Sequence, residues 1–187
     1  EITDAFGIDA DLLSKPVTSG HCAGKIRKAL AKELMLDADT VIVSGCHDQI
    51  AAMTGANVLE CGDVMDGTGT VECVPVVMES MPRDFSLFEC GFSFAPHING
   101  KYACYVLSYT GGATLKWFRD NFSDKSYAEL DSEVSEKPTD LLIMPHFAGA
   151  ATPYMDSSSK AAVIGLTFEH TKADIYKALM EGTAYEI

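Results

Sequence analysis

The 187-residue chain lacks long apolar runs, an excess of positive charge and any closely spaced cysteine pair. No apolar run approaches the roughly 20 residues that a helix needs to cross a bilayer. Lys and Arg number 14 against 27 Asp and Glu, so the formal net charge is −13. Phosphate backbones and anionic membrane surfaces repel a chain this acidic. The composition therefore predicts that neither nucleic acid nor a membrane is a partner.

Six cysteines are scattered along the chain, and no two of them have C-x-x-C spacing. Secreted disulfide scaffolds are usually shorter and denser in cysteine. We therefore predict reduced thiols in a cytoplasmic protein, mostly packed as small apolar residues and binding no metal.

The two ends of the sequence are unusual. Residue 1 is Glu and no signal-peptide pattern follows it, while a helical pattern continues to Ile187 without a Gly or Pro stop. We expect the chain to be an internal part of a longer protein.

The chain has the composition of a globular protein, 47% hydrophobic and 22% charged. Segments with strand-like and helix-like patterns alternate along it. The pattern predicts an α/β fold. The least patterned stretch is 78–88, which predicts a boundary between a first domain over 1–77 and a second over 78–187. The expected elements are an amphipathic helix over 24–36, a buried strand over 41–43 with a helix to about 55, a strand over 71–74, a hairpin of 92–98 and 101–109 around Asn99-Gly100, a helix over 113–121, a helix and loop within 124–137, a buried strand over 141–144, and a last helix opened by a Thr171/Asp174 capping box.

The most informative segment is 41–56, where an apolar strand meets a tight turn and then a helix start. His47, Asp48 and Gln49 crowd at that turn. In open α/β sheets, ligands bind beyond the carboxyl ends of the strands, where an Asp can act as a general base. Asp is also a favoured helix N-cap, so from these residues alone Asp48 is either a catalytic base or a cap.

Two glycine-rich turns are candidate anion sites. The run 66–70 reads Asp-Gly-Thr-Gly-Thr, which suits either backbone contact with an anion or an ordinary β-turn. The run 110–113 opens a helix with a glycine pair, which suits either a phosphate or close packing of that helix on a sheet. Lys116 lies one turn further on, where it either reaches a ligand or is simply a surface lysine.

A third candidate is the loop 145–153, which follows a buried strand and contains His146. Such a loop is well placed to line a site. A single histidine such as His146 or His47 is, however, more often a hydrogen-bonded structural residue than a catalytic one.

In their order and spacing these motifs resemble the FGGY family of carbohydrate kinases. The run 45–49 resembles the family's Gly-x-x-Asp-Gln segment, 69–70 its Gly-Thr turn, and 111–120 its Gly-Gly helix start with Trp and Arg-Asp. The runs 152–156 and 161–182 resemble its Thr-Pro-x-x-Asp loop and C-terminal signature. The chain departs from the pattern at Leu179, a packing matter, and at 150–151, where many sugar kinases have Glu-Arg; this leaves the substrate subgroup open.

The resemblance implies an actin-like ATPase fold, with ribonuclease H-like domains, in which this chain spans the junction of the two domains. It also implies ATP-dependent phosphorylation of a hydroxyl of a sugar or polyol. Asp48 would be the catalytic base and would hold Mg²⁺ indirectly through water, and Gln49 and His47 would contact the substrate. Gly69, Thr70, Gly112 and Lys116 would bind ATP.

The family's first phosphate motif and its later adenosine segment do not occur in the sequence, so we expect the isolated chain to be inactive. Two other functions stay open: a non-catalytic actin-like nucleotide-binding or regulatory module, and an acyl phosphotransferase on a related fold. An intact Asp48 disfavours the first, and the lack of an arginine motif disfavours the second. The resemblance leaves open both the sugar and a homodimer of the whole protein.

Overall fold

The computed structural model describes residues 2–187, and its contacts divide the chain into two compact units, 1–51 and 52–187. We describe each unit by itself. The predicted domain boundary at 77/78 differs from this contact-based division and stays a prediction. No helix within 2–187 is long and apolar enough to cross a membrane.

The first unit is built around a two-stranded antiparallel sheet in which β2 pairs with β1. Its elements are α1 (Ile2–Ala5), the 3₁₀ turn η1 (Ala10–Leu12), β1 (Cys22–Lys25), α2 (Lys28–Glu33), β2 (Val41–Val43) and the first residues of α3 (Asp48–Gly55).

The helix predicted over 24–36 is wrong at both ends, because α2 covers only Lys28–Glu33. Gly24 and Lys25 belong instead to β1 and pair with Ile42 and Val41. Gly24 has a φ of 132°, which side-chain-bearing residues rarely adopt, and α2 begins only at Lys28. The apolar spacing was helical, but pairing with strand residues 16 and 18 positions further along the chain overrides it.

The strand predicted over 41–43 exists, but it is not buried. Val41, Ile42 and Val43 are about half exposed, at 55, 46 and 55%. Its pairing with β1 is antiparallel. Within 2–51, β1 is the only strand that pairs with β2.

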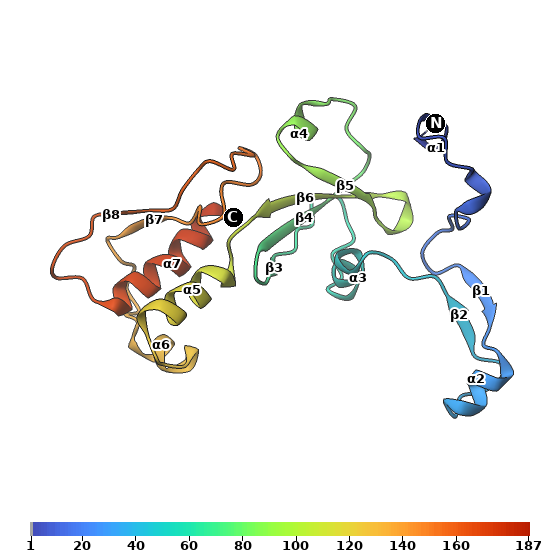
Figure 1. The fold of residues 1–187 in the computed structure, drawn as a ribbon, viewed down its shortest axis with the longest axis horizontal. Coiled ribbons are helices and arrows are strands. Elements are labelled where there is room, and N and C mark those ends of the chain that lie inside the picture. The colour runs from blue at the N-terminus through green and yellow to red at the C-terminus, as the bar shows by residue number, and fades with distance from the viewer. Residues whose placement is uncertain (1) are drawn as a thin grey trace. The chain divides into compact units, whose positions relative to one another are not determined.

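The second unit contains a four-stranded antiparallel sheet in the order β3-β4-β6-β5, and a separate pair β7-β8 (Figure 1). Its strands are β3 (Gly67–Thr68), β4 (Glu72–Met78), β5 (Ser93–Pro96), β6 (Tyr102–Ser108), β7 (Leu142–Met144) and β8 (Ala162–Ile164). Its helices after α3 are α4 (Ser86–Glu89), the 3₁₀ turn η2 (Ile98–Gly100), α5 (Gly112–Phe122), α6 (Tyr127–Glu133) and α7 (Lys172–Glu186).

Local signals predicted several of these elements correctly. The hairpin of β5 and β6 turns at Asn99 and Gly100, whose φ values of 58° and 76° explain why those residue types are used there. The last helix begins at the expected capping box, in which the Thr171 hydroxyl accepts from the Asp174 N–H.

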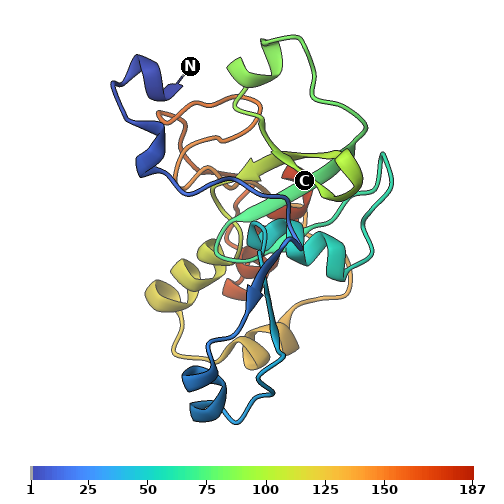
Figure 2. The same cartoon turned by 90° about the vertical axis from the view of Figure 1, so that its right-hand side faces the viewer.

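The core of this unit lies between helices α5, α6 and α7 and strand β7, which group together in Figures 1 and 2. It is formed by Phe118, Leu130, Leu141, Ile143, Tyr176, Ala178 and Leu179. Burial of its large aliphatic and aromatic side chains contributes roughly 1.5–3 kcal/mol each. The strand predicted over 141–144 is buried only in alternation, because Leu142 is 59% exposed while Ile143 faces the core. This core holds α5, and so positions the residues at its N-terminus.

Candidate nucleotide site and the candidate base

Asp48 is the first residue of α3, in a turn that hydrogen bonds hold after β2. Ser44 donates from its hydroxyl to the Thr18 carbonyl at 2.7 Å and from its N–H to the His21 carbonyl at 2.9 Å. Asp48 Oδ1 accepts from the Gln49 N–H at 2.8 Å. A capping Asp accepts instead from N–H groups two or three residues on. The Asp48 side chain is 89% exposed, so its carboxylate remains open to solvent.

The two neighbours of Asp48 differ in their surroundings. His47 Nδ1 lies 3.4 Å from Asp48 Oδ1, and the His47 side chain is 61% exposed. Gln49 is half-buried, and its Oε1 atom is buried with no hydrogen-bond partner among residues 2–187. The roles of all three residues toward a substrate stay predictions.

The four residues predicted to bind ATP lie together in the second unit. Gly69, Thr70, Gly112 and Lys116 all line one pocket of about 480 Å³, which we call the glycine pocket. Its remaining lining residues are Ala113, Trp117, Asp120, Asn121 and Tyr127. The sequence therefore predicted correctly that the two glycine turns lie at one cleft.

The helix N–H groups that were expected to face a phosphate are used differently. Gly112 donates to the Gly69 carbonyl at 2.7 Å, and Ala113 donates to the Thr70 carbonyl at 3.2 Å. Gly111 also donates to Thr70, at 3.2 Å. The first turn of α5 therefore bonds to the Gly69–Thr70 backbone, which favours the packing alternative for the glycine pair, and the role of Gly112 toward ATP stays a prediction.

The glycine pair has a packing role, as its alternative interpretation proposed. A Cβ atom at Gly112 would lie 2.9 Å from the Gly69 carbonyl oxygen, and one at Gly111 would lie 3.0 Å from the same atom. Real Cβ atoms essentially never come as close as the 2.9 Å at Gly112, and 3.0 Å at Gly111 is tighter than most real Cβ contacts, so glycine at both positions lets the two turns touch.

Three polar side chains of the pocket come from α5: Lys116, Asp120 and Asn121. Lys116 forms an ion pair with Asp120, four residues on, and Arg119 bonds to the same carboxylate at 3.1 Å. These two cations hold the pKa of Asp120 below its usual range. Trp117 is 41% exposed, which leaves an aromatic surface at the pocket.

Two lining residues were not singled out from the sequence. Asn121 lies four residues after Trp117, so helical spacing from Ala113 and Trp117 could have predicted it. Tyr127 begins α6, and its ring lies 4.4 Å from the Arg119 guanidinium carbon. No local signal connects Tyr127 to the glycine turns, because its approach depends on the connection between α5 and α6.

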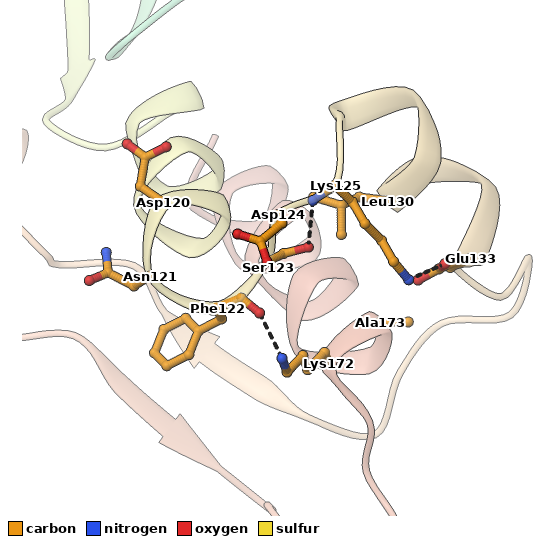
Figure 3. Close-up of a pocket in the computed structure, with 10 residues that line it drawn as sticks. All are labelled: Asp120, Asn121, Phe122, Ser123, Asp124, Lys125, Leu130, Glu133, Lys172 and Ala173. Atoms are coloured by element: carbon orange, nitrogen blue, oxygen red, sulfur yellow. Dashed lines mark hydrogen bonds and ion pairs between the residues drawn. The ribbon is translucent and has the colours of Figure 1, made fainter.

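A second pocket, of about 500 Å³, lies where the end of α5 meets α6 and the start of α7 (Figure 3). Its two lysines already have partners: Lys172 donates to the Phe122 carbonyl at 2.8 Å, and Lys125 forms an ion pair with Glu133. None of the predicted site residues lines this pocket, so we assign it no function.

The loop after β7 lines a third pocket, of about 590 Å³. His146 bonds to the Ser159 hydroxyl through Nδ1 at 2.7 Å and to the Glu186 carboxylate through Nε2 at 2.6 Å. Glu186 in turn accepts from the Ser108 hydroxyl at 2.8 Å. Both ring nitrogens of His146 are thus engaged, which matches the structural interpretation of this residue.

The comparisons agree with the motifs. Residues 68–187 match the model of the C-terminal domain of the FGGY family of carbohydrate kinases. The chain belongs to this family. A curated xylulose kinase from Staphylococcus epidermidis is 28% identical over 192 residues, covering 100% of this chain and 38% of that protein.

Two solved structures of the family share the fold. The ligand-bound xylulose kinase from Lactobacillus acidophilus has a TM-score of 0.81 and 21% identity, covering 99% of this chain and 38% of that one. The glycerol kinase from Plasmodium falciparum with ADP has a TM-score of 0.82 and 21% identity, covering 99% and 37%. The actin-like ATPase fold predicted from the sequence is therefore confirmed, and the chain spans about 38% of the length of its curated relatives.

Proposed function

We propose that this chain is part of a kinase that transfers a phosphoryl group from ATP to a hydroxyl of a sugar or polyol. Asp48 takes the hydroxyl proton as general base, and Gln49 and His47 contact the substrate. Gly69, Thr70, Gly112 and Lys116 line the nucleotide side. The observation that carries the proposal is the glycine pocket, where four residues from two separate motifs meet in a member of the FGGY family.

The residues of the glycine pocket suit a nucleotide. The Thr70 hydroxyl and the Lys116 ammonium are donors for phosphate oxygens, and the exposed ring of Trp117 offers an apolar surface. The close contact of the two glycine turns leaves backbone, without side chains, facing the ligand. Mg²⁺ bound with ATP would neutralise charge on the phosphates, and Asp48 would hold it through water.

A substrate panel tests this proposal in the whole protein. Ketoses, aldonates and polyols are each incubated with ATP, and ADP formation is followed against controls without acceptor. We expect ADP formation to depend on one class of acceptor. ADP binding without any phosphorylated acceptor would instead support the non-catalytic nucleotide-binding module.

The 187-residue chain alone should show no measurable kinase activity. It lacks the Asp-x-Gly-Thr phosphate motif that the resemblance calls for, and it spans only 38% of the length of its relatives. The measurement is ADP release with the acceptor that the whole protein prefers. Turnover near about 1 per second, within the usual range of kinases, would contradict this prediction.

A further inference from the structure

Glu72 is the only buried carboxyl group within residues 2–187, with 2% of its surface exposed. It opens β4, where it pairs with Thr68 of β3 on one side and with Ser108 of β6 on the other. From the sequence, Glu72 is predicted only to lie in a strand over 71–74. A buried carboxyl group is costly unless it is paired or neutral, so this position calls for an explanation.

The Glu72 side chain lies beneath the contact between the two glycine turns. A Cβ atom built on Gly111 would collide with the Glu72 carboxyl group, so this group occupies the space that a side chain at Gly111 would need. The same Cβ would lie 3.0 Å from the Gly69 carbonyl oxygen. The carboxyl group therefore lies against the backbone that lines the glycine pocket.

Among residues 2–187, no cation forms an ion pair with this carboxyl group. Its Oε2 atom is buried and has no hydrogen-bond partner among residues 2–187. Burial raises the pKa of Glu72, the Asp66 carboxylate raises it further, and the Thr68 hydroxyl opposes them. On the other elements, Ser108 of β6 donates to the Glu186 carboxylate, and Lys116 of α5 pairs with Asp120.

We propose that Glu72 is a positioning residue that takes up a proton when a nucleotide polyphosphate binds in the glycine pocket. This inference rests on the proposed nucleotide role of that pocket. A polyphosphate places negative charge beside Gly69 and Thr70, so it favours the neutral form of the carboxyl group behind them. By linkage, a proton on Glu72 favours nucleotide binding to the same extent. A metal ion is a poorer fit, because no group of three or more metal-ligating side chains gathers within 2–187.

The direction of the pH dependence follows from this linkage. Below the pKa of Glu72 the carboxyl group is already neutral, so its ionisation adds no pH dependence to ADP binding. As pH rises above that pKa, each binding event must recruit a proton, and affinity falls by up to about tenfold per pH unit. Titration of ADP itself adds a pH dependence that is the same for every variant.

The test is calorimetric titration of ADP into the whole protein and its variants between pH 5 and 8. We expect Glu72→Gln, which is nearly isosteric and permanently neutral, to lose the fall in affinity seen in the wild type at high pH. Glu89→Gln removes an exposed carboxylate of α4 and should keep the wild-type profile. Asp66→Asn removes the neighbouring negative charge and so lowers the pKa of Glu72. In this variant ADP affinity should start higher and should begin to fall at a lower pH than in the wild type.

Identical profiles for wild type, Glu72→Gln and Asp66→Asn would overturn the proton uptake while leaving nucleotide binding in place. Absence of ADP binding by the wild type at every pH would overturn the proposed function and this inference together. If Glu72→Gln fails to fold by circular dichroism, the profile of Asp66→Asn decides: a shift supports the proposal, and no shift refutes it.

Discussion

Asp48→Asn in the whole protein is expected to lower turnover by about two to four orders of magnitude, the usual contribution of a general base. The amide is nearly the size of the carboxylate but cannot accept the substrate proton. The side chain is 89% exposed, and its described contacts are with its two chain neighbours, the Gln49 N–H and His47 Nδ1, so the fold has little reason to change. ADP affinity should stay within about threefold of wild type, because the residues proposed to contact the nucleotide are others.

The measurement combines steady-state kinetics on the preferred acceptor with calorimetric titration of ADP. Asp39→Asn is the matched control, since Asp39 is an exposed carboxylate of the same unit whose described ion pair is with Lys25. Exposed pairs contribute about 0–1 kcal/mol, so this variant should keep both activity and stability. Turnover of Asp48→Asn within about threefold of wild type would reject the role of Asp48 as base and support a structural role at the start of α3.

Gly112→Ala is expected to weaken ADP binding at least about tenfold and to destabilise the protein by about 1–3 kcal/mol, the usual cost of overpacking. The new Cβ would lie 2.9 Å from the Gly69 carbonyl oxygen. That atom belongs to the backbone and accepts the Gly112 N–H bond, so it cannot swing aside as a flexible side chain would. The two turns must separate, and the pocket that both of them line changes shape.

Denaturant unfolding and ADP titration measure the two effects. Gly55→Ala is the matched control, because it makes the same chemical change where a Cβ would meet nothing within 4 Å. Gly55 ends α3, and alanine is the better helix former by up to about 1 kcal/mol, so stability should hold or rise slightly. Wild-type stability and wild-type ADP affinity in Gly112→Ala would mean that neither folding nor nucleotide binding depends on the close contact between the two turns.

The parts of the fold that the sequence predicted well depend on short-range chemistry. Asn99 and Gly100 supply the positive φ values of the β5–β6 hairpin, and Thr171 and Asp174 cap α7. Each signal lies within four residues of the structure that it specifies. The helix at α5 was likewise predicted, from the glycine pair at its start.

The parts that were missed depend on distant partners. β1 forms because Gly24 and Lys25 pair with β2, and no sequence pattern near Gly24 predicts that pairing. The exposure of Val41–Val43 depends on what covers the sheet rather than on the apolar character of the strand. A strand of β-branched residues has the same sequence pattern whether its sheet is covered or exposed to solvent.

The candidate site follows the same division. Glycine turns at Gly69 and Gly112 are visible in the sequence, and their motif order predicted that they share a cleft. The sequence did not reveal that the two turns form backbone hydrogen bonds with each other, because those bonds join residues more than 40 positions apart. Glu72 went unnoticed because a Glu in an alternating strand normally faces solvent, whereas here the glycine turns cover it.

A crystal structure of the whole protein with ADP and its preferred acceptor would show where the nucleotide and the acceptor bind. We expect the ADP phosphates beside Gly69, Thr70 and Lys116, and the reacting hydroxyl of the acceptor within hydrogen-bond reach of Asp48. ADP bound elsewhere, such as in the pocket between α5, α6 and α7 (Figure 3), or an acceptor hydroxyl remote from Asp48, would contradict this expectation.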